Sequence, residues 1–416
     1  MARVLICVLP AQGHVGPTLP VAEALVRAGH AVQVLTGRRY IDAFAAVGAD
    51  AARLPEEADF DEGHFPEREG LQGLRLARAD LTGFVTRMGP QLMAIDGLLE
   101  TRAIDVVLCD PLLMAGLPLT MRRRRPPVLV LGFVPLAVPM PGLAPPRTLV
   151  DRARNLAMTA TTHALMRPVQ AAAVREVRSL TGRAPEVMFM DWPLGSDGVL
   201  QLTCPGFEPP RELPVPVDFV GPLSASGAEQ HSLPPWWPDL DGDNPIVLVT
   251  QGSVANDLDD LVRPTLNALA DEEILVVVST GGTDLPASEV PANARIAESL
   301  PYDELLPRCA LMVTNGGYGG VNHALRHGVP LVCVGATEDK PAVVERVRWS
   351  GAGVGIMRPR VSTRAVGKAI RRVLREPRYQ ARAQALAEEI STCPGTGGVV
   401  DAVERAVERH RGAGGN

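Results

Sequence analysis

The segment from residue 310 to residue 340 constrains the fold more than any other part of this 416-residue chain. An apolar run at residues 310–313 is followed by glycines at positions 316, 317, 319 and 320, and then by a helical pattern at residues 321–326. A short run that is apolar at every position is typical of a strand buried on both faces of a parallel sheet. Glycines after such a strand permit a tight turn, and they also let an anion lie against the amides at the start of the next helix. The loop is therefore either a tight connection or a phosphate site.

The residues that follow favour the phosphate site. Gly328 ends the helix, a second apolar strand covers residues 331–334, and polar residues at 337–340 come directly before a helix that begins at Pro341. The carboxyl ends of neighbouring parallel strands meet at one edge of the sheet, where open α/β sheets bind their ligands. The segment thus predicts a phosphate-binding loop beside a hydroxyl-binding loop.

The same segment resembles the signature of the family 1 glycosyltransferases, in their plant secondary-product and bacterial natural-product forms. The matching residues, in order, are Pro301, Leu305, Leu306, Pro307, Cys309, Gly316, Gly317, Gly319, Ala324, Leu325, Gly328, Val329, Pro330 and Asp339. The resemblance implies an α/β fold of two doubly wound Rossmann-like domains that face each other across a cleft, the GT-B arrangement.

The activity that the resemblance implies is inverting transfer of a sugar from a UDP- or dTDP-linked donor. The acceptor would be a hydroxyl of a small apolar natural product, in secondary metabolism such as antibiotic biosynthesis. Two alternatives stay open, a nucleotide-sugar epimerase of the same fold and a non-catalytic sugar-nucleotide-binding partner.

Strand and helix patterns alternate along both halves of the chain. An N-terminal acceptor-binding domain is expected at residues 1–205, with its last strand at 199–202, and a C-terminal nucleotide-sugar-binding domain at 245–395. Nine prolines between residues 205 and 238 indicate a linker at 206–244. The resemblance implies that a helix within residues 396–416 crosses back to the first domain. Residues 60–97 show weak periodicity and are expected to form a variable, mobile segment, and a helix interrupted near Pro168 is expected at 149–180.

His14 follows the first predicted strand, residues 4–9, in a loop that precedes a helix predicted at 19–28. Asp110 follows the predicted strand at 104–109, so that both side chains emerge at the carboxyl edge of one sheet. A carboxylate beside an imidazole fixes its tautomer and stabilises its protonated form. A helix cap for His14 and a turn residue for Asp110 are the plainer interpretations. The resemblance implies a catalytic dyad, with His14 as the base and Asp110 as the residue that orients it.

The resemblance assigns the donor to the second domain. The implied contacts are Gly252, Ser253, Leu300, Tyr302, Asn315, Gly316, Gly317, Gly319, Gly320, His323, Asp339 and Lys340. Asn315, His323 and Lys340 depart from the family pattern, in which histidine, glutamate and glutamine are usual at these positions. The stacking tryptophan of plant members is also absent, which leaves Tyr302 as the nearby aromatic for the base. The Lys340 ammonium either reads the sugar, pairs with Glu338 or reaches the diphosphate.

The acceptor cleft is expected near Phe65, Phe133 and Met140. No metal or other cofactor is expected. Asp239 and Asp241 match the Asp-x-Asp pattern of metal-dependent glycosyltransferases, but they lie in the proline-rich segment with no nucleotide-binding strand before them. A solvated linker is therefore the favoured interpretation of that pair.

Composition excludes several other classes of protein. A net charge of −6 and a pI near 5.8 argue against a nucleic-acid partner. Six cysteines without a Cys-x-x-Cys pair indicate buried thiols in a reducing compartment, and no apolar run approaches the length of about 18 residues that a membrane helix needs. We expect a cytoplasmic protein whose partners are a nucleotide-sugar donor and a small-molecule acceptor, and a homodimer stays open.

Overall fold

The computed structural model describes residues 1–60, 71, 73–142, 145–146, 148–223, 233–251 and 257–413. The chain divides into two compact units. The first unit comprises residues 1–202, 210–225 and 393–416, and the second comprises residues 203–209 and 226–392.

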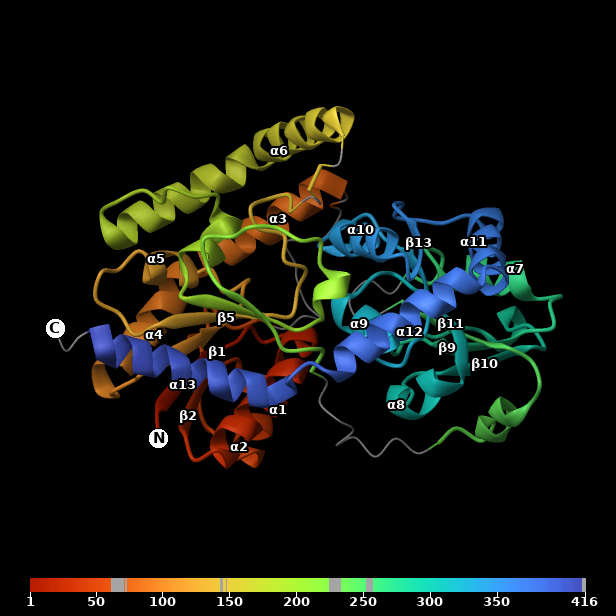
Figure 1. The fold of residues 1–416 in the computed structure, drawn as a ribbon, viewed down its shortest axis with the longest axis horizontal. Helices are drawn as coiled ribbons and strands as arrows, with labels where there is room; N and C mark the ends of the chain where they lie inside the picture. The colour runs from red at the N-terminus through yellow and green to blue at the C-terminus, as the bar shows by residue number, and fades with distance from the viewer. Residues whose placement is uncertain are drawn as a thin grey trace. The chain divides into compact units, whose positions relative to one another are not determined.

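The first unit is built on a seven-stranded sheet in which all neighbouring strands are parallel (Figure 1). The strand order is β3-β2-β1-β4-β5-β6-β7. The strands are β1 (Arg3–Cys7), β2 (Ala31–Thr36), β3 (Asp50–Arg53), β4 (Val106–Cys109), β5 (Val128–Gly132), β6 (Gly198–Gln201) and β7 (Val217–Phe219).

Helices cover both faces of this sheet, so that alternate residues of one strand enter two different apolar cores. Leu5 and Cys7 of β1 lie in one core, and Val4 and Ile6 lie in the other. The helices are α1 (Gln12–Arg27), α2 (Ile41–Ala46), α3 (Gly73–Thr86), α4 (Met88–Thr101), α5 (Gly116–Thr120), α6 (Leu149–Thr181) and α13 (Gly395–Ala413). Figure 1 shows α3 beside α6, and α13 beside α1. Burial on both faces explains why the central strands β4 and β5 carry no polar residue.

The second unit contains a six-stranded parallel sheet in the order β10-β9-β8-β11-β12-β13. Its strands are β8 (Ile246–Thr250), β9 (Leu275–Ser279), β10 (Ala294–Ala297), β11 (Cys309–Thr314), β12 (Leu331–Val334) and β13 (Gly353–Ile356). Its helices are α7 (Val262–Leu269), α8 (Tyr302–Leu305), α9 (Tyr318–Arg326), α10 (Lys340–Ser350), α11 (Thr363–Arg375) and α12 (Pro377–Ser391). The prediction of two parallel α/β sheets with covering helices is confirmed.

A buried ion pair fixes residues 203–209 to the second unit. The guanidinium of Arg346, on α10, donates to the Glu208 carboxylate over 2.8 and 2.7 Å, and the side chain of each is only 2% exposed. The hydroxyl of Tyr318, the first residue of α9, donates to the same carboxylate over 3.0 Å. The network therefore links this segment to the two helices that follow β11 and β12.

Three expectations about the first unit are wrong. Within the segment expected at 60–97, where no regular element was predicted, residues 73–86 and 88–97 belong to α3 and α4, because apolar residues such as Val85, Met88 and Ile95 enter the core. Residues 61–70 and 72 of that segment lie outside the described residues. The helix α6 runs through Pro168, which lies on an exposed turn where water can satisfy the carbonyl that the proline leaves without a donor. The sheet does not end at residues 199–202, since β7 pairs with β6 and Val217 packs against the core.

No helix among the described residues is long and apolar enough to span a lipid bilayer. All six cysteines lie within the described residues, and none forms a disulfide. Burial raises the pKa of Cys309 and Cys333 to about 12, so these thiols stay protonated at neutral pH.

Candidate active site

A histidine and an aspartate meet at the carboxyl edge of the first sheet. The strand β1 lies between β2 and β4, so the winding of the sheet reverses between β1 and β4, which is where open α/β sheets bind ligands. His14 lies in the first turn of α1, just after β1, and Asp110 directly follows β4. The Nδ1 atom of His14 is 2.8 Å from Oδ2 of Asp110, so the structure brings the two predicted catalytic residues together.

Asp110 is held rigidly by the backbone around it. Its side chain is fully buried, Oδ2 accepts from the amide of Leu9 over 2.9 Å, and Oδ1 accepts from the amide of Leu112 over 2.8 Å. The expected turn role of Asp110 is thus real and coexists with the contact to His14. An ionised carboxylate can only accept hydrogen bonds, so Nδ1 of His14 carries the hydrogen and Nε2 carries the lone pair.

The helix-cap interpretation of His14 is wrong. The helix α1 begins at Gln12, earlier than predicted, and its N-cap residue Ala11 makes no side-chain cap. His14 is therefore inside the helix, where its own amide bonds to the carbonyl of Ala11 and its ring reaches Asp110. The side chain of His14 is 17% exposed, which leaves part of the ring open to a small molecule.

Of the predicted acceptor residues, Phe133 contacts His14 and Met140 lies further along the same segment. The rings of Phe133 and His14 are 4.7 Å apart, edge to face. The amide of Met140 donates to Oδ1 of Asp191 over 2.8 Å, and Arg211 donates to the carbonyls of Leu136 and Gly142. Phe65 lies outside the described residues.

Asp191 and Arg211 hold the segment after β5 and were missed by sequence reasoning. Burial raises the pKa of Asp191 above its ordinary value of 3.8, and the hydrogen bond from the Met140 amide only partly opposes this. No local pattern marks either residue, because each acts on a segment far away in the sequence.

The second sheet has a corresponding reversal between β8 and β11, since β8 lies between β9 and β11. Some of the predicted donor residues follow the strands at this edge. Asn315 follows β11, its amide bonds to the carbonyl of Thr250, and its side-chain amide donates to the carbonyl of Gln251 after β8. Gly252 and Ser253 lie outside the described residues.

The four loop glycines differ in backbone conformation and in the space around them. Gly316 has φ +88, and a Cβ there would come within 3.0 Å of Sγ of Cys333, so this glycine is needed for the fold. Gly317 and Gly319 are exposed, and a Cβ on either would meet nothing within 4 Å. The helix α9 begins at Tyr318, three residues before the predicted start, which places Gly319 and Gly320 in its first turn. The open face beside Gly317 and Gly319 is where an anion can approach the helix start.

His323 points its ring at a carboxylate. Its Nε2 atom is 2.7 Å from Oδ1 of Asp303, and Nε2 of His327 is 3.1 Å from the same oxygen. Burial lowers the pKa of His323 below its ordinary value of 6.5 and outweighs the opposing effect of Asp303, so the ring is neutral at pH 7. Burial raises the pKa of Asp303, but the hydrogen bonds from the two histidines prevail and hold it below 3.8.

Tyr302 and Leu300 lie beside this group. The ring of Tyr302 is 6.0 Å from that of His323, and its hydroxyl bonds to the side chains of Thr250 and Ser279. Leu300 is 5% exposed and belongs to the packed interior. A contact of Tyr302 with a base stays a prediction.

The ammonium of Lys340 pairs with Glu338, which is one of the three outcomes that the sequence left open. Nζ of Lys340 is 2.8 Å from Oε2 of Glu338, and the lysine side chain is only 8% exposed. Glu338 has φ +57, a conformation that non-glycine residues rarely adopt, and Asp339 is the N-cap of α10. The helix begins at Lys340, so this side chain lies in its first turn.

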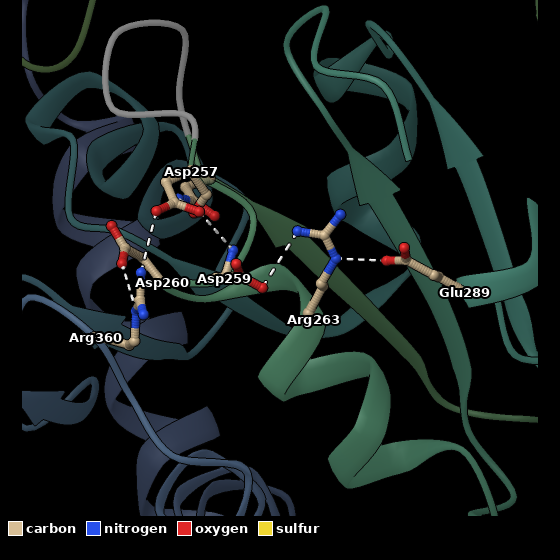
Figure 2. A network of polar contacts seen from close by, with 7 residues as sticks. Asp257, Asp259, Asp260, Arg263, Glu289 and Arg360 are labelled. Carbon is tan, nitrogen blue, oxygen red and sulfur yellow. Dashed lines mark hydrogen bonds and ion pairs between the residues drawn. The ribbon is translucent and has the colours of Figure 1, made fainter. Parts of the chain in front are cut away.

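An ion-pair network holds the chain just after the undescribed residues 252–256 (Figure 2). Arg360 pairs with Asp257 and Asp260, each over 3.1 Å, while Arg263 pairs with Asp259 and Glu289. All of these groups are substantially exposed, so the network contributes little to stability. It does fix the chain downstream of the predicted Ser253 contact.

Asp239 and Asp241 each pair with an arginine. The two aspartates lie on a short 3-10 helix at Trp237–Asp241. Asp239 bonds to Arg295, and Asp241 bonds to Arg308. A carboxylate that faces a guanidinium is a poor ligand for a divalent cation, so these contacts support the non-metal interpretation. The pair belongs to a folded element of the second unit.

Comparisons with known proteins show which family the chain resembles. Residues 263–406 match the family model described as erythromycin biosynthesis protein CIII-like, C-terminal domain. The chain is 36% identical to 4'-demethylrebeccamycin synthase of Lentzea aerocolonigenes, over 98% of this chain and 100% of that protein. It is 30% identical to UDP-glucosyltransferase B1 of Starmerella bombicola, over 93% and 94% of the two chains.

Solved structures show the same fold. The calicheamicin glycosyltransferase CalG4 superposes with a TM-score of 0.69 and 21% identity, over 98% of this chain and 99% of that one. The glycosyltransferase VinC, solved in complex with dTDP, superposes with a TM-score of 0.66 and 21% identity, over 98% and 100% of the two chains. From its sequence relatives and its two parallel α/β units, this chain belongs to the family 1 glycosyltransferases of natural-product type, with the GT-B fold.

Proposed function

We propose that the protein transfers a sugar, with inversion, from a UDP- or dTDP-linked donor to a hydroxyl of a small, largely apolar natural product. The observation that carries the proposal is the contact between His14 and the buried Asp110 at the reversal point of the first sheet. The names of the relatives support the compound class, since one is a demethylrebeccamycin synthase and another a UDP-glucosyltransferase.

The chemistry follows from the tautomer of His14. Its Nε2 lone pair takes the proton of the acceptor hydroxyl, and Asp110 stabilises the imidazolium that forms. The acceptor oxygen then forms a bond to the anomeric carbon while the bond from that carbon to the diphosphate oxygen breaks. The diphosphate leaves with the electron pair, so a single displacement inverts the anomeric centre.

We assign acceptor binding to the first unit and donor binding to the second. Phe133 presents an apolar ring beside His14, and the segment fixed by Asp191 and Arg211 extends that surface. The amides at the start of α9, beside Gly317 and Gly319, stabilise the departing diphosphate. His323 in its neutral form accepts a hydrogen bond from the ribose, and Lys340 with Asp339 faces the sugar.

Replacing the base tests the mechanism. We expect His14→Ala to lower turnover by roughly 10² to 10⁴, the usual contribution of a positioned general base, while nucleotide affinity is unchanged. Asp110→Asn retains an acceptor for the Leu9 amide and is expected to cost less. Turnover of His14→Ala at the wild-type rate, or a product that retains the donor anomer by NMR, contradicts the proposal.

Metal independence is part of the proposal, because helix-start amides and neutral donors take the place of a cation on the diphosphate. Activity is expected to survive treatment with EDTA. A complete loss that Mg²⁺ or Mn²⁺ restores would instead point to Asp239 and Asp241.

The two alternative functions are separated by one assay. An epimerase would convert a UDP-linked sugar without any acceptor, and a non-catalytic binding partner would bind nucleotide without turning over with any acceptor. The intact contact between His14 and Asp110 favours the transferase over both.

A further inference from the structure

Two histidines and an aspartate converge at the end of α9. His323 and His327 are one helical turn apart, so their side chains share a face of the helix. Both Nε2 atoms point at Oδ1 of Asp303 on α8, over 2.7 and 3.1 Å, and the two rings are 5.4 Å apart. One potential ligand atom from each residue lies within 4.8 Å of the others.

We propose that Asp303, His323 and His327 bind a Zn²⁺ ion. Two imidazole nitrogens and one carboxylate oxygen are a ligand set that zinc uses in proteins, with bonds of about 2.0 to 2.2 Å. Ligand atoms of such a tetrahedral site are about 3.3 Å apart, so the contacts of 2.7 and 3.1 Å to Oδ1 of Asp303 need to open by about 0.6 and 0.2 Å. The two histidine nitrogens, which lie within 4.8 Å of each other, need to reach the same separation. Hard cations such as Mg²⁺ prefer oxygen ligands and are poor occupants.

The cluster is also accessible. The side chains of His323 and His327 are 17% and 19% exposed, and that of Asp303 is 48% exposed. An ion can therefore enter from solvent, and water can occupy the fourth position. Among the described residues, this is the group of three potential ligands whose ligand atoms all lie within 4.8 Å of one another.

Zinc would reverse the hydrogen-bonding role of His323, and this step rests on the proposed function. Without metal, Nε2 donates to Asp303 and Nδ1 holds the lone pair that accepts from a ribose hydroxyl. With metal on Nε2, the ring hydrogen lies on Nδ1, which can then only donate. Bound zinc is thus expected to weaken nucleotide binding without excluding it, and it is not required for sugar transfer.

Cobalt titration of the EDTA-stripped full chain tests the site directly. We expect one Co²⁺ per chain with the visible absorption of a low-coordinate site, displaced by Zn²⁺. His327→Gln should weaken binding at least about tenfold, since it removes one ligand. The control His410→Gln changes an exposed histidine on α13 and should bind as the wild type does. Three results would overturn the site. The wild-type spectrum could lack these bands, it could show absorption from thiolate bound to cobalt, or His327→Gln could bind Co²⁺ as tightly as the wild type does.

Nucleotide affinity tests the coupling. One equivalent of Zn²⁺ is expected to weaken UDP or dTDP binding by about fivefold to tenfold in the wild type, the value of one hydrogen bond, and not in His327→Gln. An equal effect of zinc on both proteins overturns the coupling. A protein that binds Co²⁺ as expected but binds no nucleotide contradicts the proposed donor site and leaves the metal site supported.

Discussion

Lys340 and Glu338 determine which charge the polar loop after β12 can present to a sugar. Their ion pair neutralises the ammonium, so a preference for an acidic sugar requires that the pair opens. We expect Glu338→Gln to raise the rate with UDP-glucuronate relative to UDP-glucose by about tenfold, because it releases a charged donor worth about 1.5 kcal/mol. Relative turnover over UDP-glucose, UDP-glucuronate and dTDP-deoxysugars measures this.

Lys340→Gln is the matched variant for the same panel. It restores the residue that is usual in the family, and we expect it to shift relative rates towards UDP-glucose. Unchanged relative rates in both variants would mean that Lys340 does not read the sugar. Hydrogen exchange in the second unit of each variant separates this outcome from simple loss of fold.

The meeting of His14 and Asp110 could be predicted from the sequence, but the residues that hold the segment after β5 could not, for a physical reason. His14 and Asp110 follow apolar strands, and the rules of parallel sheets place such residues at one edge. Asp191 is 51 residues from its partner Met140, and no periodicity in the sequence relates them. The sequence could not decide whether Lys340 contacts the sugar, Glu338 or the diphosphate, because its long, flexible side chain can reach several partners.

At the scale of elements, the start of α9 separates Gly316, which the fold needs, from Gly317 and Gly319, which face open space. Ala is a better helix former than Gly, so Gly319→Ala in the first turn should leave stability unchanged or raise it by up to about 1 kcal/mol. Its Cβ would enter the open face, and we expect UDP or dTDP affinity to fall at least about tenfold. Calorimetric titration measures the affinity.

Gly320→Ala is the control on the same turn. Its Cβ would lie 3.7 Å from the Met312 side chain, an ordinary contact on the inner side of the helix. It should therefore keep wild-type nucleotide affinity. If both variants bind equally well, the diphosphate does not lie against Gly319.

The ion pair between Glu208 and Arg346 ties residues 203–209 to α10. Because both side chains are buried, removal of one partner leaves an uncompensated charge. We expect Arg346→Met to lower the free energy of unfolding of the second unit by about 3 to 5 kcal/mol. The double variant Glu208→Gln with Arg346→Met should recover part of this loss. Urea denaturation of all three proteins checks it, and equal stability of wild type and Arg346→Met contradicts it.

Element boundaries show where sequence patterns suffice. The strand β12 has the predicted bounds of residues 331–334, because it is a continuous apolar run between Pro330 and Gly335. The strand β3 was missed because it is only partly buried, and β13 because two of its four residues are glycine. The predicted starts of α1 and α9 are too late, since Pro17 lies inside α1 and Gly319 and Gly320 lie inside the first turn of α9.

At the scale of the whole molecule, two units with separate sheets need not unfold together, so one melting temperature describes the chain poorly. Hydrogen exchange resolves the units instead. A nucleotide that binds only the native second unit stabilises it by about 2.7 kcal/mol at a concentration 100 times its Kd. We expect UDP or dTDP to slow exchange in α9 and at the start of α10.

The first unit provides the internal control for that experiment. Amides of β1 and β4 lie in a different sheet, with its own apolar cores, and should exchange at the same rate with and without nucleotide. Exchange measured with GDP at the same concentration tests whether the site distinguishes the nucleobase. Exchange measured on Gly319→Ala tests the contact with the diphosphate. Protection that appears in β1 and β4 but not in α9 would place the nucleotide in the first unit, and the donor and acceptor assignments would have to be exchanged.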